Sequence, residues 1–576
     1  MRYANLCILL LLIATFSIPI SSLTLRGAPH FKDRKQTPSS KQFWLNALLN
    51  PNKVGDFGPN FQCFVCTLLL TTVEQYATLH QINIDDFVMK DFCNFFPKGV
   101  RATCQGLVNQ YGAQIVASLL KHSSGDQACR DIKICSNPKC NLMPQNKTNT
   151  LKSSGNWENY KGNPALLYHE ASSPFDLRAG KTNHTPQYDF DGDFFSQTVG
   201  ELRGYHWRGR DCDDLNAKIY PGRKTNPFPG GSSDFNCNGI KGANPKTGKA
   251  YKDELCENSG QMGVVVMGDS AGAHCEIPPS WVNASEWNST TFANIGPAVE
   301  DEIDLPHMSA YTGYMDVGNT GPVSSIYKKL LERNKCNFRD YQNIAVNGAS
   351  SIDSLGNIMA LSRSQQDDQP VLAFLELIAN DICDHRPTFD AMTTPEQFKT
   401  NMLAILDYLD TRLPPGSHLT VIGLVNGSMV FEGVKDKMHP IGVSYSQYYD
   451  FSNCIEASFC WGWLNTNATV REITTQKAME LNQVHKDILS TYQAKNFDFI
   501  YLDFPAQEIW DEWVAKGNDP YELIEPVDGF HPNQIFTALL ADKIWEHLEA
   551  EKPEWLGPVN PNNDLITQLF GDQGGY

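Results

Sequence analysis

Apolar runs alternate with amphipathic stretches from about residue 259 to the end of the chain. Five of these runs predict strands: 262–268, 341–350, 370–381, 418–428 and 497–505. Between them, apolar residues recur three and four positions apart, which predicts helices over 324–334, 395–413 and 474–495. Continuous apolar strands that alternate with helices are typical of a parallel sheet covered on both faces, so we predict a three-layer α/β domain over 259–576.

A second pattern lies between residues 59 and 140. Amphipathic stretches such as 66–80 and 106–122 predict an all-α module of four or five short helices. The module carries six cysteines, Cys63, Cys66, Cys93, Cys104, Cys129 and Cys135. A module of about eighty residues buries a small core, so disulfides are expected, but spacing alone allows fifteen pairings. A metal site at the C-x2-C pair is the alternative, although no second pair lies at zinc-ribbon spacing.

This six-cysteine layout resembles the saposin B-type domain. The resemblance implies the disulfides Cys63–Cys135, Cys66–Cys129 and Cys93–Cys104. It also implies that an apolar helix face contacts lipid. A purely structural domain or folding aid is the alternative interpretation.

The first residues are typical of a secretory signal peptide over 1–22, with Arg2 before a short apolar core. That core is too short for a membrane span, and a short membrane anchor is the alternative. We interpret the basic stretch 23–58 as a propeptide or flexible arm, with contact to anionic lipid as the alternative. The polar stretch 141–185 is predicted to be a linker that is cleaved during maturation.

Cysteines and glycosylation sequons agree with secretion. The chain has 16 cysteines, which favours an oxidising compartment, and no later segment is apolar enough to span a membrane. The sequons predict N-glycosylation at Asn146, Asn183, Asn283, Asn288, Asn426 and Asn467.

The net charge of −18 argues against binding to nucleic acid, because phosphates would be repelled. Acidic residues gather in the segment 186–258, where alternating oxygen ligands and a glycine turn suit Ca²⁺. The candidate ligands are Asp189, Asp191, Asp193, Asp211, Asp213, Asp214, Asp234, Asn236 and Asn238. The segment resembles the D-x-D-G-D calcium-binding segments of extracellular proteins, and a disulfide between Cys212 and Cys237 would pin it. Disordered acidic turns are the alternative.

The candidate chemistry lies at the ends of the α/β domain. Ser270 follows the strand over 262–268, at the edge of a parallel sheet where ligands bind. A serine hydroxyl needs a base, and His531 is the best candidate, with Asp528 three residues earlier to orient it. A turn serine is the alternative for Ser270.

Gly268-Asp269-Ser270 together with Asp528-x-x-His531 resembles the GDSL, or SGNH, hydrolase family. The resemblance implies a flavodoxin-like fold and an oxyanion site made by the backbone N–H groups of Ser270 and Gly348 and by the Asn380 amide. Two positions depart from the family, since Ala271 replaces its leucine and Ile378 stands where many members have glycine.

We interpret several other titratable residues as structural. Asp269 is expected to fix the turn, and His274 to form a wall of the site. We assign no partner to His307, His385 and His439 and interpret them as structural.

The whole order of signal, saposin-type domain, Asp-rich segment and GDSA-type hydrolase resembles the acyloxyacyl hydrolase family. That resemblance implies a secreted or lysosomal esterase that removes secondary acyl chains from lipid A of lipopolysaccharide and also acts on phospholipids. It implies two chains joined by a disulfide from Cys140 to Cys454 or Cys460. A lipid-transfer protein with an inactive hydrolase domain, or an SGNH esterase of other specificity, is the alternative.

Overall fold

The structure is a computed structural model that describes residues 60–144, 150–155, 157, 184–199, 202–228, 233–295, 298, 301–316 and 321–576. The predicted signal peptide, the arm and most of the predicted linker lie outside these residues. The domain boundaries drawn from the sequence stay predictions.

Five parallel strands form one sheet in the order β2-β1-β3-β4-β5. The strands are β1 (Gly263–Gly268), β2 (Tyr341–Asn343), β3 (Val371–Glu376), β4 (Ser417–Ile422) and β5 (Phe497–Leu502). Every residue of the central strands β1 and β3 is buried, as their continuous apolar sequences predict. The predicted runs 341–350 and 370–381 leave the sheet early, because their last residues turn into loops at its carboxyl edge.

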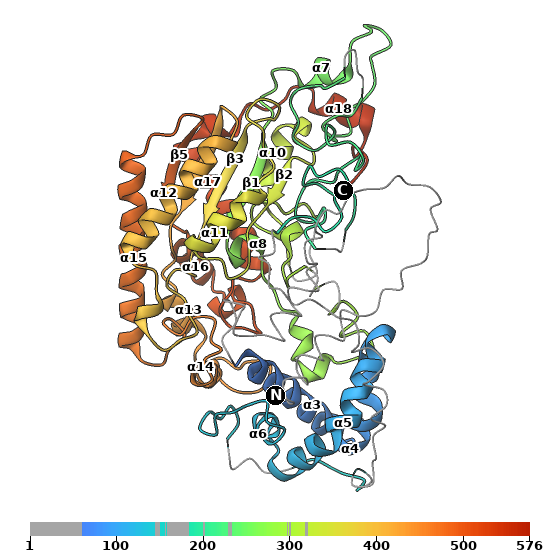
Figure 1. Ribbon diagram of the computed structural model, residues 1–576, viewed down its shortest axis with the longest axis vertical. Helices are drawn as coiled ribbons and strands as arrows, with labels where there is room; N and C mark the ends of the chain where they lie inside the picture. The colour runs from blue at the N-terminus through green and yellow to red at the C-terminus, as the bar shows by residue number, and fades with distance from the viewer. Residues whose placement is uncertain are drawn as a thin grey trace, which may run out of the picture.

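Helices cover both faces of the sheet, so the three-layer prediction is confirmed (Figure 1). On one side α11 (Ser351–Asn357), α12 (Pro395–Arg412) and α15 (Ala468–Thr491) pack together. On the other, α17 (Gln534–Glu551) packs with α10 (Ile326–Arg333) and α16 (Ala506–Ala515). Helix α15 begins six residues before the predicted start, because the Asn467 side chain caps it at the Thr469 N–H.

The all-α module lies at one end of the molecule, beside α14 (Tyr445–Cys454) and far from α7 (Tyr251–Cys256) and α18 (Asn563–Phe570) (Figure 1). Its main helices are α3 (Phe61–Leu79), α5 (Lys98–His122) and α6 (Gly125–Asp131), with the short α4 (Ile84–Asp86) between the first two. Helix α5 has 25 residues and is longer than the short helices that the sequence predicts. No helix among the described residues is long and apolar enough to cross a bilayer.

Seven disulfides cross-link the described part of the chain. Three lie in the all-α module, Cys63–Cys135, Cys66–Cys129 and Cys93–Cys104, which are the pairs implied by the saposin resemblance. Cys140 bonds to Cys454 rather than to Cys460, which bonds to Cys383. The remaining bonds are Cys212–Cys237 and Cys256–Cys336.

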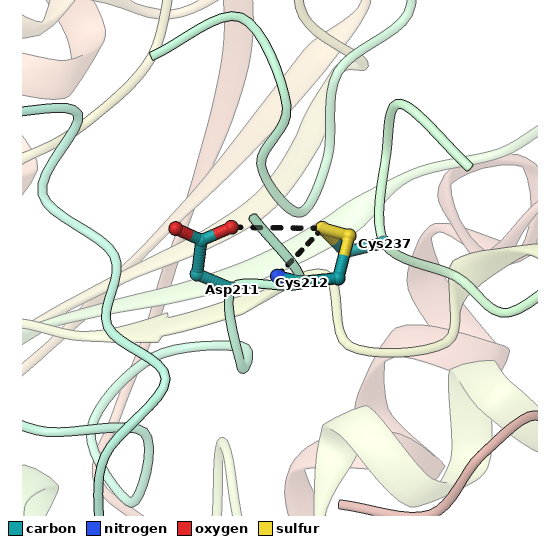
Figure 2. Close-up of side chains that lie close together, drawn as sticks. All are labelled: Asp211, Cys212 and Cys237. Atoms are coloured by element: carbon teal, nitrogen blue, oxygen red, sulfur yellow. Dashed lines mark hydrogen bonds between the residues drawn. A yellow bond between two sulfur atoms is a disulfide. The ribbon is translucent and has the colours of Figure 1, made fainter. Parts of the chain in front are cut away.

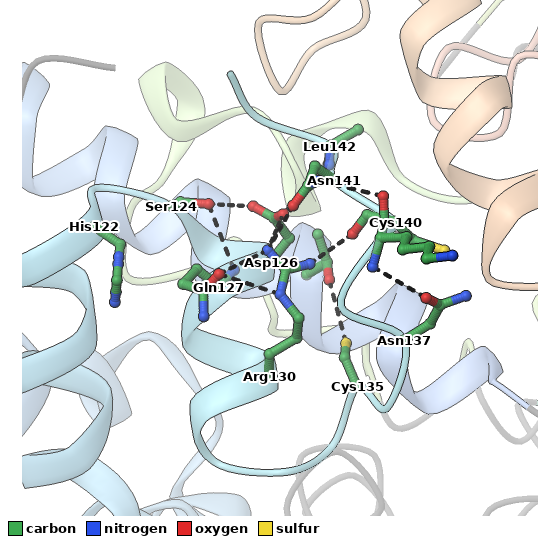
Figure 3. A network of polar contacts seen from close by, with 12 residues as sticks. His122, Ser124, Asp126, Gln127, Arg130, Cys135, Asn137, Cys140, Asn141 and Leu142 are labelled. Atoms are coloured by element: carbon green, nitrogen blue, oxygen red, sulfur yellow. Dashed lines mark hydrogen bonds and ion pairs between the residues drawn. The ribbon is translucent and has the colours of Figure 1, made fainter. Parts of the chain in front are cut away.

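A network of polar contacts fixes Cys140 for its bond with α14 (Figure 3). The Arg130 guanidinium donates to the Cys140 carbonyl over 2.6 Å and to the Asn141 side chain over 2.9 Å. It also pairs with the buried Asp126 carboxylate at 2.9 Å. The chain after α6 is therefore held where its cysteine meets α14.

Candidate active site

Ser270 stands where β1 passes into the short helix α8 (Ser270–Ala273). Gly268 ends the strand, and a Cβ there would lie 2.3 Å from the Glu376 carbonyl oxygen, so only glycine fits. Asp269 caps α8 by accepting from the Ala271 N–H, and its other oxygen accepts from the Ile378 N–H. Burial raises the pKa of Asp269 to about 6. As expected, this carboxylate fixes the turn that presents Ser270.

Ser270, His531 and Asp528 lie in one hydrogen-bonded line. His531 Nε2 is 2.8 Å from the Ser270 hydroxyl, although 261 positions separate the two residues. His531 Nδ1 is 2.6 Å from Asp528 Oδ2. A carboxylate at Nδ1 holds the proton on that nitrogen, so Nε2 is free to accept the serine proton.

Opposing influences act on the His531 imidazole. Burial is the largest single influence and lowers the pKa of His531, but the charge and hydrogen bond of Asp528, together with the charge of Asp269, raise the pKa above its ordinary value. The imidazole is therefore a stronger base than a buried histidine without a partner, which suits a group that removes a proton in the reaction.

The loop 525–531, here called the catalytic loop, carries both partners. The Glu525 carboxylate accepts from the N–H groups of Val527 and Asp528, the latter over 2.7 Å. Asp528 in turn accepts from the His531 N–H over 3.0 Å. Immediately after the loop, Asn533 caps α17, so the histidine is held between a folded turn and a helix start.

The candidate oxyanion groups line one cavity with Ser270. Gly348, Asn380 and His531 border a cavity of about 510 Å³, and Phe61 of the all-α module borders it too. Gly348 has a φ of +78°, and its turn brings the backbone to the cavity wall. Ser270 opens α8, so its N–H has no acceptor within the helix. The arrangement offers hydrogen-bond donors to an oxygen that gains negative charge beside Ser270.

A second, apolar cavity of about 650 Å³ opens from the same serine. Its lining includes Val425, Met429, Phe504, Trp510, Phe530 and Phe536. Ile378, the departure from the family glycine, is one of the residues that line this cavity. A cavity of this chemistry accepts a flexible hydrocarbon chain next to the serine hydroxyl.

The other histidines have partners that the sequence did not reveal. His274 was expected to form a wall of the site, but it lines neither cavity. Its ring lies between the Thr537 hydroxyl at 3.2 Å and the Glu276 carboxylate at 3.4 Å. His307 pairs with His206 over 2.6 Å, and His385 lies 3.7 Å from Asp384. His439 donates from Nε2 to the Val527 carbonyl in the catalytic loop, so this residue, taken as partnerless, contacts the site's framework.

The Asp-rich segment forms two groups of carboxylates within metal-binding distance of each other. One comprises Asp189, Asp191 and Asp214, and the other Asp191, Asp193 and Asp211. Burial raises the pKa of Asp193 to about 9 and that of Asp211 to about 7. Five buried side-chain oxygens here accept no hydrogen bond from the described residues, those of Asp191, Asp193, Asp211, Asp234 and Asn236. These oxygens fit a hard cation. Asp213, which its sequence pattern placed among the candidate ligands, belongs to neither group of carboxylates.

Cys212 and Cys237 close the Asp-rich segment as a disulfide beside Asp211 (Figure 2). The Cys212 N–H lies 3.1 Å from Cys237 Sγ, and an Asp211 oxygen lies 3.8 Å from the same sulfur. Bonded sulfurs offer no thiolate to a metal, so the oxygens of this corner are the available ligands.

Comparison with known proteins agrees with both modules. Residues 264–544 match the family described as GDSL-like Lipase/Acylhydrolase, and residues 62–175 match the Saposin-like domain. The chain is 38% identical to an acyloxyacyl hydrolase of Oryctolagus cuniculus over 90% of its length and 94% of the relative's. It is 36% identical to the acyloxyacyl hydrolase of Homo sapiens over 89% of its length and 93% of the relative's. The chain belongs to the acyloxyacyl hydrolase family.

As a member of the acyloxyacyl hydrolase family with a GDSL-like domain, the protein is a lipid esterase. The saposin-like module reaches the cavity at Ser270 through Phe61. Sequence patterns did not single out Phe61, because an apolar residue at a helix start looks like any other core position.

Proposed function

We propose that the protein hydrolyses secondary, acyloxyacyl-linked fatty chains of lipid A, using Ser270 as nucleophile. The observation that carries the proposal is the 2.8 Å contact between Ser270 and His531, both of which line an apolar cavity. Relatives named acyloxyacyl hydrolase support the choice of bond, since the name describes an ester between two acyl groups.

The reaction follows from the geometry in two halves. His531 Nε2 takes the Ser270 proton as the hydroxyl oxygen attacks the ester carbonyl, and Asp528 stabilises the imidazolium. The N–H groups of Ser270 and Gly348 and the Asn380 amide donate to the oxyanion. As the intermediate collapses, the ester C–O bond breaks to leave the acyl group on Ser270, and His531 protonates the leaving oxygen, which becomes a hydroxyl of the retained acyl chain. Water activated by the same imidazole hydrolyses the acyl-enzyme, which releases the fatty acid and restores Ser270.

The two cavities divide the substrate between them. The released chain occupies the apolar cavity lined by residues such as Trp510 and Phe536. The cavity shared by Phe61 and Ser270 faces the saposin-like module, so the remainder of the lipid lies against that module. Phospholipids also present a fatty acyl ester, here to glycerol, beside an apolar chain, and they are proposed as further substrates.

Purified lipopolysaccharide incubated with the protein is expected to lose only its secondary acyl chains. Mass spectrometry of lipid A before and after incubation measures which chains are removed. Loss of primary, sugar-linked chains, or no loss while simple lipid esters are cleaved, would contradict the assignment to the acyloxyacyl bond.

Matched substrates separate this function from its alternatives. Release of acetate from acetylated glycans without release of fatty acid would support an SGNH esterase of other specificity. Binding of lipid A without any release, and without covalent labelling by a fluorophosphonate, would support a lipid-transfer protein.

We propose that the Asp-rich segment binds structural Ca²⁺. Asp189, Asp191, Asp193, Asp211 and Asp214 would hold one ion or two, with Asp234 and Asn236 at the neighbouring turn. The buried oxygens without partners support this, because burying several carboxylates together is unfavourable until a cation neutralises them. The segment shares no residue with the catalytic site, so the ion supplies stability rather than chemistry.

Removal of calcium is expected to lower the melting temperature. At a Ca²⁺ concentration 1,000 times its Kd, the loss is about 4 kcal/mol of unfolding free energy. Differential scanning calorimetry with EDTA, followed by added Ca²⁺ or Mg²⁺, measures the effect, and Asp193→Asn should blunt it. Equal recovery with Mg²⁺, or an unchanged transition in EDTA, would argue against a calcium site.

The proposal also includes the compartment in which the protein resides. Seven disulfides in the described residues fit an oxidising compartment, and we propose extracellular or lysosomal residence. The sequons at Asn288, Asn426 and Asn467 have exposed side chains and that at Asn283 is half-buried. Asn146 and Asn183 lie outside the described residues, as does most of the proposed cleavage region. After cleavage there, Cys140–Cys454 would join the two chains.

A further inference from the structure

Helix α14 lies against the catalytic loop and supplies three of its hydrogen-bond donors. The hydroxyl groups of Tyr445 and Tyr448 donate to the carbonyls of Pro526 and Val527 over 2.7 and 2.9 Å. The hydroxyl of Tyr449 donates to the Gly529 carbonyl. These acceptors surround Asp528, so one face of α14 determines where the backbone of the catalytic aspartate lies.

A fourth donor comes from the segment before α14. His439 Nε2 donates to the Val527 carbonyl over 2.7 Å, and its Nδ1 accepts from the Ile441 N–H over 3.1 Å. Burial lowers the pKa of His439 to about 4, so the ring is neutral at neutral pH and its tautomer is set by these two contacts. The Val527 carbonyl therefore accepts two hydrogen bonds at neutral pH, one from the Tyr448 hydroxyl and one from His439 Nε2.

The same elements are held from the other side by the saposin-like module. The Phe64 ring of α3 lies 5.6 Å from the Tyr448 ring and 6.3 Å from the Phe459 ring. Phe459 in turn packs edge-on against His531, with ring centroids 5.7 Å apart.

Two more contacts tie the module to these elements. The Gln75 side chain of α3 donates to the Ile441 carbonyl, next to the contact that sets the His439 tautomer. The disulfide from Cys140 joins the module to the last residue of α14.

We propose that Tyr448 and His439 are positioning residues for the Asp528–His531 pair, and that the saposin-like module supports them through Phe64 as well as contacting lipid. The inference rests on the proposed function, since it concerns the same serine, histidine and aspartate. If the module served lipid contact alone, disturbing Phe64 would matter only for lipid substrates. Through α14 it also affects hydrolysis of a short ester, although Phe64 itself lines neither of the two cavities at Ser270.

The test uses 4-nitrophenyl butyrate, a small water-soluble ester, and the full-length protein. Tyr448→Phe removes one donor to the loop and keeps the ring, and Phe64→Leu removes the ring that packs on Tyr448. Their matched controls are Tyr341→Phe, which loses a buried hydroxyl bonded to the Tyr205 carbonyl, and Phe96→Leu, which loses a module ring stacked on Phe292 at 4.7 Å. Neither control residue contacts α14 or the catalytic loop in the contacts of the described residues.

We expect Tyr448→Phe to lower kcat about 3- to 10-fold with KM unchanged, the effect of losing one hydrogen bond. Phe64→Leu should lower kcat in the same direction. The acid limb of the pH profile should move to lower pH in Tyr448→Phe, because Asp528 raises the His531 pKa more than Asp269 does and its contact with the imidazole loosens. A smaller folded fraction would scale the rate equally at every pH, so the shift separates positioning from misfolding. Fluorophosphonate titration counts the active sites in each preparation.

Activity of Tyr448→Phe and Phe64→Leu within twofold of wild type, or equal losses in the two controls, would overturn the inference. If Tyr448→Phe is not secreted, Phe64→Leu carries the test alone, since it leaves every loop donor in place. Ser270→Ala is measured beside them. An active Ser270→Ala variant refutes the proposed function, whereas an inactive one with an unaffected Tyr448→Phe refutes only the positioning role.

Discussion

Replacing Ser270 with alanine is expected to lower kcat for fatty acid release by at least ~10⁴-fold. The variant keeps the proposed oxyanion donors at Gly348 and Asn380 and the apolar cavity, so we expect that lipid still binds. It lacks the oxygen that forms the acyl-enzyme, and no other hydroxyl lies within hydrogen-bond distance of His531 Nε2 among the described residues. Release of labelled fatty acid from lipopolysaccharide measures the rate.

Ser490→Ala is the control, because its exposed hydroxyl on α15 bonds, within the described part of the chain, only to the helix backbone at Asp487. That variant should match wild type in secretion, melting temperature and rate. A Ser270→Ala protein that folds, binds lipid and still releases fatty acid would remove this serine from the mechanism.

Replacing Asp528 with asparagine is expected to lower kcat about 10³- to 10⁴-fold. An amide in place of the carboxylate no longer holds the proton on His531 Nδ1, and it no longer stabilises the imidazolium. The acid limb of the pH–rate profile should also move. The base works only when neutral, so the wild-type rate falls as pH drops through the raised His531 pKa. Without the Asp528 charge, burial dominates, the pKa falls below its ordinary value, and the acid limb shifts to lower pH.

The measurement is kcat/KM against pH for both proteins, with circular dichroism to establish that the variant is folded. Asp384→Asn is the control, since Asp384 also lies beside a histidine, His385, but at 3.7 Å and in neither cavity wall. A shift of the acid limb to higher pH, or a loss below tenfold, would mean that Asp528 does not act on His531 as its geometry indicates.

Sequence patterns predicted the fold class because burial leaves strong local signals. The central strands are apolar on both faces, and in the segments between them apolar residues recur three and four positions apart, as in helices. The parallel sheet could therefore be inferred, and it is confirmed. The module's three disulfide pairs followed from a family layout rather than from geometry. Spacing could not choose between Cys454 and Cys460, because the choice depends on where α14 ends against the chain after α6.

The candidate site could be predicted where side chains carry motifs, and the structure brings Ser270, Asp528 and His531 together. The hydrogen bonds that hold the catalytic loop in place could not be predicted. The acceptors for Tyr445, Tyr448 and His439 are backbone carbonyls, which leave no trace in the residue types around them. His274 shows the opposite error. Its closeness in sequence to Ser270 suggested that it forms a wall of the site, whereas its ring contacts Thr537 instead.

The bond between Cys140 and Cys454 spans 314 positions, and among the described residues it is the one disulfide that joins the saposin-like module to the hydrolase domain. In a chain cut after residue 144, that bond alone makes the association of the two pieces unimolecular. Its reduction would replace a fixed effective concentration with an ordinary dissociation equilibrium. Activity of the reduced, cleaved protein should then depend on dilution, whereas the oxidised form keeps its specific activity at any concentration.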